Sequence, residues 1–206
     1  VIVEKPLGVN IEDAINFTKF CNKRGIIVQV NLWRRGDRIY QKLAKSQFSE
    51  LVGEPQSVFS NYGNGLKNNG VHLIDLIRFL MGEIKSVQSI PGYKLIKVGP
   101  LDDDFNIPAV LSMESGVPVA LFPISFNNYR EISLEVWGTK GLLSCLIEGL
   151  SNTVYPIADN RCLIGEKEIN INTKPIRPKA PEIICFLYLY KIIAIIIKNK
   201  PVYLNF

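Results

Sequence analysis

The hydrophobic positions switch several times between strand and helix patterns along the chain. A β-branched run at residues 1–3 comes first, then apolar residues at helical spacing between Asn10 and Gly25, then a continuous apolar run at residues 26–30. These patterns predict a strand, a helix capped by Asn10 and a second strand buried on both faces. Residues 1–31 therefore form a β-α-β unit of the kind that builds parallel sheets.

Later in the chain, short apolar stretches with strand periodicity dominate. A helical pattern covers residues 39–52, and two glycine-containing segments, residues 114–116 and 138–141, have the composition of hairpin turns. The expected strands are residues 57–62, 87–90, 109–113, 117–125, 132–137, 142–147 and 153–157. The sequence therefore predicts an α+β fold in residues 32–206, a large antiparallel or mixed sheet with helices on one face.

A predicted helix among these strands carries the only histidine of the sequence, His72. Asn68 or Asn69 can cap its first turn, and Gly82 stands where a left-handed residue commonly ends a helix. The positive end of the helix dipole disfavours the imidazolium, so a neutral ring is expected near pH 7. Asp75 lies on the same helix face. The pair is either a proton-transfer site or a buried histidine with a structural role.

The last apolar segment, residues 183–197, is expected to be a buried helix, with a strand at residues 201–206. As a helix the segment would reach about 22 Å, against a hydrocarbon core of about 30 Å. It also contains Lys191. A buried helix is therefore favoured over the alternative of a membrane anchor, and no membrane partner is expected.

The net charge of +5 and the pI near 9.0 do not arise from a basic patch. The densest basic run, residues 34–38, contains an aspartate, so nucleic-acid binding is not expected. No Cys-x-x-Cys pair occurs among the cysteines, so neither a metal site nor a redox motif is indicated. Buried, reduced thiols and a cytoplasmic location are expected. The cysteines are Cys21, Cys145, Cys162 and Cys185.

A dinucleotide site requires a Gly-x-Gly-x-x-Gly turn, in which bare backbone approaches the pyrophosphate. The sequence contains no such turn, and its glycine cluster at residues 63–68 is interpreted as a loop. Residues 1–31 are therefore interpreted as the C-terminal remnant of a truncated Rossmann domain. Residues 32–206 are interpreted as an α/β domain for substrate binding and oligomerisation.

Two motifs, in this order, resemble the Gfo/Idh/MocA family of nicotinamide-dependent oxidoreductases. The first is Glu4-Lys5-Pro6 at a strand end, and the second is Asn-x-Gly-x-His-x-x-Asp at residues 68–75. The resemblance implies hydride transfer between NAD or NADP and a hydroxyl-bearing carbon of a sugar, sugar nucleotide or cyclic polyol. It also implies a homo-oligomer that associates through the sheet.

The resemblance assigns the chemistry to Lys5, beside the nicotinamide and the substrate hydroxyl, and to His72 as acid/base. Asn68 stands where many members have an aspartate; it can orient a hydroxyl but cannot take a proton, which leaves the proton transfer to His72 and Lys5. Asp75 is assigned to substrate binding with these residues. Each of these residues has a structural alternative. Lys5 is then a strand-end lysine paired with a carboxylate, and His72 is a core histidine. Asn68 is then a helix cap, and Asp75 orients His72 or pairs with Arg78.

The cofactor-binding residues implied by the resemblance are Glu4, Lys5 and Pro6 in the turn, and Trp33, Arg34 and Arg35 along the cofactor cleft. Without the glycine-rich turn, these 206 residues are expected not to turn over by themselves. The alternative to an oxidoreductase is a non-catalytic binding or oligomerisation module of the same fold.

Overall fold

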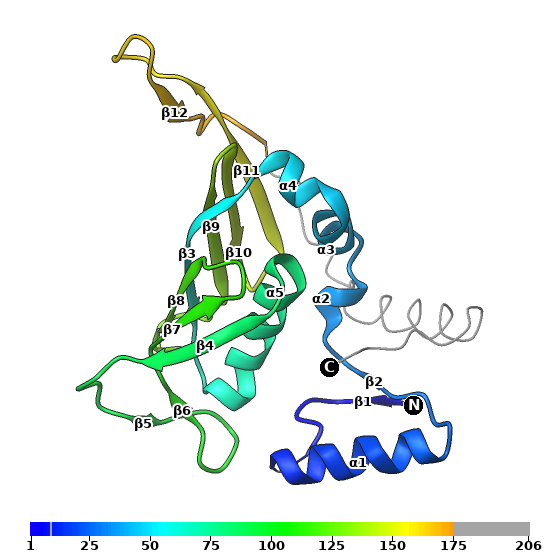
Figure 1. The fold of residues 1–206 in the computed structure, drawn as a ribbon. Coiled ribbons are helices and arrows are strands. Elements are labelled where there is room, and N and C mark those ends of the chain that lie inside the picture. Colours follow the sequence, from blue (N-terminus) through cyan, green and yellow to red (C-terminus); the bar gives the residue numbers. More distant parts are fainter. Residues whose placement is uncertain (9, 175–206) are drawn as a thin grey trace. The chain divides into compact units, whose positions relative to one another are not determined.

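The computed structural model describes residues 1–8 and 10–174 (Figure 1). The described residues divide into two compact units, residues 1–37 and residues 38–174. The assignment of residues 1–31 and 32–206 to two functional domains remains a prediction. The expected helix at 183–197, its Cys185 and the expected strand at 201–206 lie outside the described residues.

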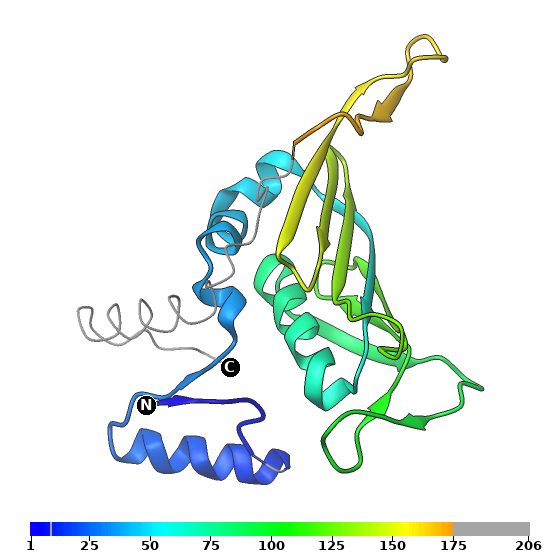
Figure 2. The same cartoon turned by 180° about the vertical axis from the view of Figure 1, so that it is seen from behind.

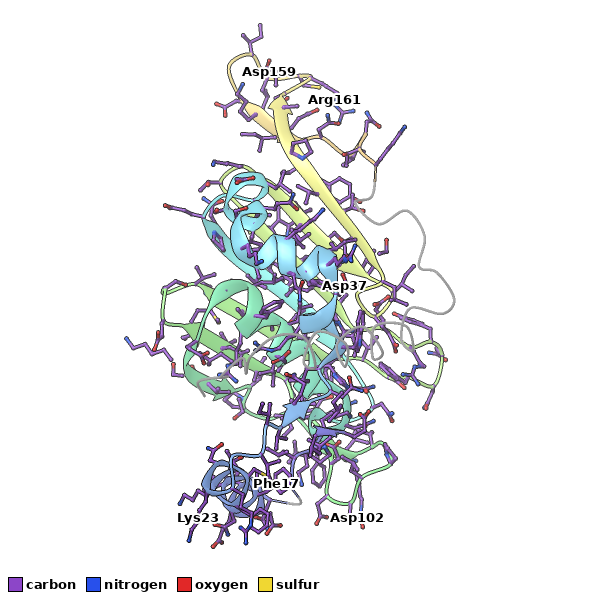
Figure 3. The ribbon with its side chains drawn as sticks, turned by 90° about the vertical axis from the view of Figure 1, so that its right-hand side faces the viewer. Phe17, Lys23, Asp37, Asp102, Asp159 and Arg161 are labelled. Carbon is purple, nitrogen blue, oxygen red and sulfur yellow. The ribbon has the colours of Figure 1, made fainter. Side chains whose placement is uncertain are left out.

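The first unit contains a strand, a helix and a second strand in the predicted order. β1 (Ile2–Val3) pairs in parallel with β2 (Gln29–Val30), and α1 (Ile11–Lys23) connects them. The Asn10 side chain caps α1 as predicted, because its Oδ1 accepts a hydrogen bond of 2.9 Å from the Asp13 amide. Phe17 and Lys23 both lie on this helix (Figure 3).

The second strand is shorter and less buried than its sequence predicts. Only Gln29–Val30 of the apolar run is paired, and Ile27 is 43% exposed. The prediction of a strand buried on both faces is therefore wrong for these residues, because β1 and β2 form a sheet of two strands with no further paired strand among the described residues. A short helix that the sequence did not predict, α2 (Trp33–Gly36), follows.

The second unit opens with the predicted helix over residues 39–52, which is interrupted by a π-helical turn. It consists of α3 (Arg38–Lys42), η1 (Leu43–Gln47) and α4 (Phe48–Leu51). Tyr40 anchors this segment, since its hydroxyl donates to the Gly149 carbonyl at 2.8 Å and accepts from Asn152 Nδ2 at 2.9 Å.

The sheet of this unit has eight strands in the order β12-β11-β10-β9-β3-β8-β7-β4. The β3–β8 pair is parallel and the other pairs are antiparallel, so the predicted antiparallel or mixed sheet is a mixed one. Both predicted hairpin turns connect adjacent strands, β7 to β8 and β9 to β10. The strands are β3 (Pro55–Tyr62), β4 (Ile84–Ser89), β7 (Ala109–Met113), β8 (Pro118–Pro123), β9 (Ser133–Gly138), β10 (Gly141–Leu146), β11 (Ser151–Asp159) and β12 (Lys167–Ile169).

One row of aliphatic side chains crosses six strands of the sheet and forms its core. The cross-strand neighbours in this row are all buried. Helices α3, α4 and α5 (Val71–Met81) lie on one face of the sheet in both Figure 1 and Figure 2. The predicted α+β arrangement with helices on one face is therefore confirmed. The row consists of Leu111, Val119, Val58, Val136, Leu143 and Val154.

Several short elements escaped the sequence analysis. β5 (Ile96–Lys97) and β6 (Phe105–Asn106) form a separate two-stranded sheet. β12 pairs with the far end of β11 to form an arm that carries Asp159 and Arg161 (Figure 3). Cys162 lies near the end of this arm and is exposed, so its predicted burial is wrong, whereas Cys21 and Cys145 are buried as predicted.

Within the described residues, no helix combines the length and the apolar character that crossing a bilayer requires.

Candidate functional site

The Glu4-Lys5-Pro6 turn is fixed to the end of the neighbouring strand. The Asn31 amide donates to the Val3 carbonyl at 2.8 Å, and Asn31 Nδ2 donates to Glu4 Oε1 at 2.6 Å. The turn contains a cis peptide bond between Lys5 and Pro6, and the Lys5 side chain is half-buried. Because β1 and β2 are parallel, their carboxyl ends share one edge, which is where ligands of open α/β sheets bind.

Trp33, Arg34 and Arg35 follow the end of β2, so they start from the same edge as Lys5. The Arg34 guanidinium lies over the Trp33 ring, 4.5 Å from its centroid, and Arg34 is buried. Arg35 is half-buried. The structure therefore brings the six predicted cofactor residues to one edge of the first unit. A planar aromatic ring can stack on a planar group, and a guanidinium and an ammonium can bind phosphate. Together these side chains fit a planar, phosphate-bearing group such as NAD or NADP.

The second group of predicted site residues lies in the other unit, on α5 and the turn before it. His72 is half-buried in the first turn of α5, as predicted, and Asp75 is 8% exposed. α5 is anchored by the apolar side chains Leu73, Leu76, Ile77 and Leu80, all of them buried. The helix ends at Gly82, which has a φ of +89° as its position predicted. A half-buried imidazole held by a packed helix is suited to proton transfer.

Arg78, which the structural alternative for Asp75 would employ, forms a bidentate ion pair with Glu83. Arg78 Nε donates to Glu83 Oε2 at 2.9 Å, and Nη2 donates to Oε1 at 3.0 Å. Both groups lie at the exposed end of α5. The ion pair thus stabilises the end of the helix that is remote from His72.

The start of this helix differs from the prediction. A π-helical turn, η2 (Leu66–Gly70), precedes α5, so Asn68 and Asn69 lie inside a helical segment and neither caps α5. The glycine cluster is therefore a loop only as far as Gly65. Asn68 Nδ2 donates instead to the Asn64 carbonyl at 3.2 Å. Because the chain turns helical earlier than predicted, the acceptors for its first amides come from elsewhere in the chain.

Asp104 supplies these acceptors, and the sequence analysis missed it. Its Oδ1 accepts from the Lys67 amide at 2.9 Å, and its Oδ2 accepts from the Asn68 amide at 2.8 Å. Asp104 as a residue is 1% exposed. In the sequence Asp104 is the last of three consecutive aspartates, which have the composition of an exposed loop, so only an unusual burial of one of them could have revealed it.

Two further contacts connect the same segment to the chain ahead of η2. Asn106 Oδ1 accepts from the Gly65 amide at 3.1 Å. The Tyr62 hydroxyl donates to the Ile107 carbonyl at 2.8 Å and accepts from the Ile107 amide at 2.7 Å. Burial raises the pKa of the Tyr62 hydroxyl to about 12; the Ile107 hydrogen bond opposes the shift, and the charge of Asp104 adds to it. Residues 104–107 thus hold the connection between β3 and α5 at three points.

Comparison with known proteins agrees with this fold. Residues 43–144, about half of the chain, match the family model described as the GFO/IDH/MocA C-terminal domain, and the match includes η2 and α5. The chain therefore carries a C-terminal domain of the Gfo/Idh/MocA family, as the resemblance of its motifs implied.

Solved structures of oxidoreductases are similar over most of the chain. An NAD binding oxidoreductase from Klebsiella pneumoniae matches with a TM-score of 0.63 and 19% identity, over 82% of this chain and 53% of that one. Levoglucosan dehydrogenase, in complex with NADH and levoglucosan, matches with a TM-score of 0.73 and 17% identity, over 98% and 65%. The UDP-N-acetylglucosamine 3-dehydrogenase of Acidithiobacillus ferrooxidans matches with a TM-score of 0.70 and 15% identity, over 98% and 64%.

These comparisons define the fold of the chain. The chain spans between about half and two thirds of the length of those enzymes. No curated protein matches the sequence.

Proposed function

We propose that the chain is the C-terminal part of an NAD(P)-dependent oxidoreductase that acts on a ring-hydroxylated small molecule. The observation that carries this proposal is the position of His72 in the first turn of α5, inside the segment that matches the Gfo/Idh/MocA C-terminal domain. The cationic and aromatic edge of the first unit supports it, because that edge fits the cofactor that such an enzyme uses.

In this proposal His72 is the general base. Oxidation of a secondary alcohol requires that the hydroxyl proton leaves as the carbon loses a hydride, and a neutral imidazole within hydrogen-bond reach takes that proton. Lys5 stabilises the negative charge that develops on the same oxygen. When bound, the nicotinamide supplies the acceptor for the hydride. In the reverse reaction His72 returns the proton.

The remaining site residues bind and orient. Asn68 is an uncharged hydrogen-bonding group one helical turn before His72, and it orients a substrate hydroxyl. Asp75, buried on the same helix, orients the imidazole or accepts from a second hydroxyl. Glu4 and Pro6 shape the turn that carries Lys5, and Trp33, Arg34 and Arg35 hold the cofactor.

The proposed substrate class is a sugar, a sugar nucleotide or a cyclic polyol. Its support is the pair of similar enzymes whose substrates are a sugar anhydride and a UDP-sugar. A ring with several hydroxyl groups also suits a site in which an amide, a carboxylate and an imidazole lie on one helical segment. The choice between NAD and NADP is left to experiment.

The test compares two forms of the protein, the 206-residue chain and a form extended at its N-terminus by about 100 residues, the size of a mononucleotide-binding half with its glycine turn. Calorimetry measures binding of NAD and NADP, and absorbance follows nicotinamide reduction with a panel of sugars and sugar nucleotides. We expect binding and turnover by the extended form only. Tight binding by the short form would contradict the truncated-domain interpretation.

The second candidate function is an oligomerisation module, and a specific surface favours it. The sheet face opposite α5 carries the aromatic side chains Phe59, Phe122 and Trp137, which are 52%, 42% and 39% exposed. They alternate with the buried row of the core, so they share one face. We propose that a second copy of the chain covers this face in the cytoplasm; this association is compatible with catalysis. If the extended form binds no nucleotide, the oligomerisation module is the better account.

A further inference from the structure

Asp104 is a carboxylate, only 1% exposed, that the proposed chemistry does not use. It lies between β5 and β6, next to Asp102 and Asp103, which are exposed (Figure 3 marks Asp102 on this loop). A buried carboxylate is costly unless hydrogen bonds replace its water. Here three backbone amides do so, those of Lys67, Asn68 and Phe105, at 2.9, 2.8 and 3.0 Å.

Two of these three amides belong to η2, and they are amides that need an external acceptor. The first amides of a helical segment have no acceptor within it. Asp104 accepts from both with its two oxygens, Oδ1 from Lys67 and Oδ2 from Asn68. One carboxylate therefore fixes two successive peptide planes, and this defines the orientation of η2 more closely than a single cap would.

The carboxylate fits against bare backbone. Gly65 has a φ of +95°, and a Cβ at this position would collide with both carboxylate oxygens of Asp104. The neighbouring Gly65 amide donates to Asn106 Oδ1 at 3.1 Å. The contact between the 104–106 segment and the start of η2 thus depends on a residue without a side chain.

η2 continues without interruption into α5, so its orientation also sets the position of His72. Asn68 and His72 are four residues apart, about one helical turn. Errors of about 1 Å in the placement of a reacting group are enough to reduce catalysis strongly. A residue that fixes η2 therefore controls where the imidazole lies.

We propose that Asp104 is a positioning residue that holds Asn68 and His72 in their working arrangement through the η2 backbone. The inference rests on the proposed function for its catalytic meaning, but its structural content is tested separately. It assigns a role to a residue that lies more than 30 positions from the histidine it positions.

The test replaces one oxygen of the carboxylate by a group that cannot accept. Asp104→Asn keeps the shape of the side chain but leaves either Lys67 or Asn68 without an acceptor. Asp103→Asn is the matched control, the same substitution at the adjacent exposed position. Two signals are measured by NMR on the 206-residue chain: amide hydrogen exchange at Lys67 and Asn68, and the ring resonances of His72, the only histidine in the sequence.

We expect Asp104→Asn to accelerate exchange at Lys67 and Asn68 by roughly tenfold or more and to displace or broaden the His72 ring signals. Amides of the central strands β3 and β8 should retain their protection, and Asp103→Asn should change neither signal. Unchanged His72 signals in a folded Asp104→Asn variant would overturn the inference. If Asp104→Asn does not fold, Gly65→Ala displaces the Asp104 carboxylate instead, because a Cβ at this position would collide with both of its oxygens. His72 signals that stay unchanged in a folded Gly65→Ala variant would equally overturn the inference.

The functional arm uses the N-terminally extended protein. There Asp104→Asn should lower kcat while the affinity for the nicotinamide nucleotide stays within about twofold, because Asp104 acts on the acid/base group. If Asp104→Asn lowers kcat but leaves the His72 signals unchanged, the positioning role would also be overturned. If the extended wild type does not turn over, the proposed function fails, and the NMR result decides the structural inference independently.

Discussion

The carboxylate of Asp104 accepts a hydrogen bond of 2.8 Å from the backbone amide of Asn68, which lies 36 positions earlier in the chain. This contact connects the loop between β5 and β6 to the helical segment that carries the only histidine. A helix start capped at such a distance along the sequence depends on the whole unit being folded. The geometry of the candidate site is therefore a property of the tertiary structure and not of the local motif.

His72→Ala in the extended form should lower turnover by roughly 10²-fold or more, the usual contribution of a general base. The side chain is half-buried on a helix held by four buried apolar residues, so the fold should persist. Steady-state kinetics measures the turnover of the variant, and circular dichroism checks that it is folded. Lys85→Ala, at an exposed position of β4, serves as the control. Full activity of His72→Ala would place the histidine among the structural residues.

Lys5→Met should reduce kcat by roughly 10²-fold to 10³-fold, because methionine keeps the length of the side chain but removes the charge that stabilises the developing alkoxide. The comparison is with Lys19→Met, at an exposed position of α1. A variant that loses only nucleotide affinity, with kcat intact, would assign Lys5 to cofactor binding alone.

Tyr62→Phe should destabilise the second unit by about 1–3 kcal/mol at pH 7, since the Ile107 amide and carbonyl both lose their partner. Tyr129→Phe, at an exposed tyrosine, should cost little. Urea denaturation followed by tryptophan fluorescence measures the difference. Equal stabilities of the two variants would contradict the role given to the Tyr62 hydroxyl.

The same variant tests the pKa of Tyr62. Burial raises the pKa of this phenol from 10.0 to about 12, so only the unfolded chain ionises between these values. The stabilisation is complete below pH 10 and falls as the pH rises towards 12, by about 2–3 kcal/mol at most. The stability advantage of the wild type over Tyr62→Phe should therefore shrink in this window. An advantage independent of pH up to 12 would contradict the shifted pKa.

Gly65→Ala should destabilise more than Gly116→Ala. Both glycines have positive φ, +95° and +87°, so both substitutions strain the backbone, but a Cβ at Gly116 meets nothing within 4 Å. The additional cost at Gly65 reports the collision with the Asp104 carboxylate. Thermal unfolding of both variants gives the comparison, and equal losses would show that the contact with Asp104 adjusts at no cost.

Phe59→Glu should lower the mass of the particle in solution if a second copy covers the open sheet face. Val87→Glu places the same charge at an exposed valine that shares the opposite face with Leu111, and it should leave the mass unchanged. Light scattering after size exclusion measures both. If the wild-type protein is a monomer in solution, the proposed association is wrong.

The sequence predicted well those features that depend on neighbouring residues. Asn10 caps α1, Gly82 ends α5, and the turn at residues 114–116 joins two antiparallel strands, because capping and turn chemistry act within a few positions. His72 lies in the first turn of α5, but the helical segment already begins at η2, so the histidine is not at the free helix start that the expected dipole effect requires.

The features that escaped prediction depend on residues far apart. Asp104 is buried against η2 only because the β5–β6 loop packs there, and no local pattern distinguishes it from Asp103. The π-helical turn displaced the expected cap at Asn68 for the same reason: its amides find their acceptor through tertiary contact. The roles of Lys5 and His72 in chemistry stay predictions until they are measured.

The most direct test of the central claim is a double-mutant cycle on kcat/KM in the extended protein with Lys5→Met, His72→Ala and the double variant. If both groups act on one substrate oxygen, the double variant should be only slightly slower than the slower single variant, because the second loss removes little that remains. If the two losses multiply, or if either single variant is fully active, Lys5 and His72 do not share a reaction centre.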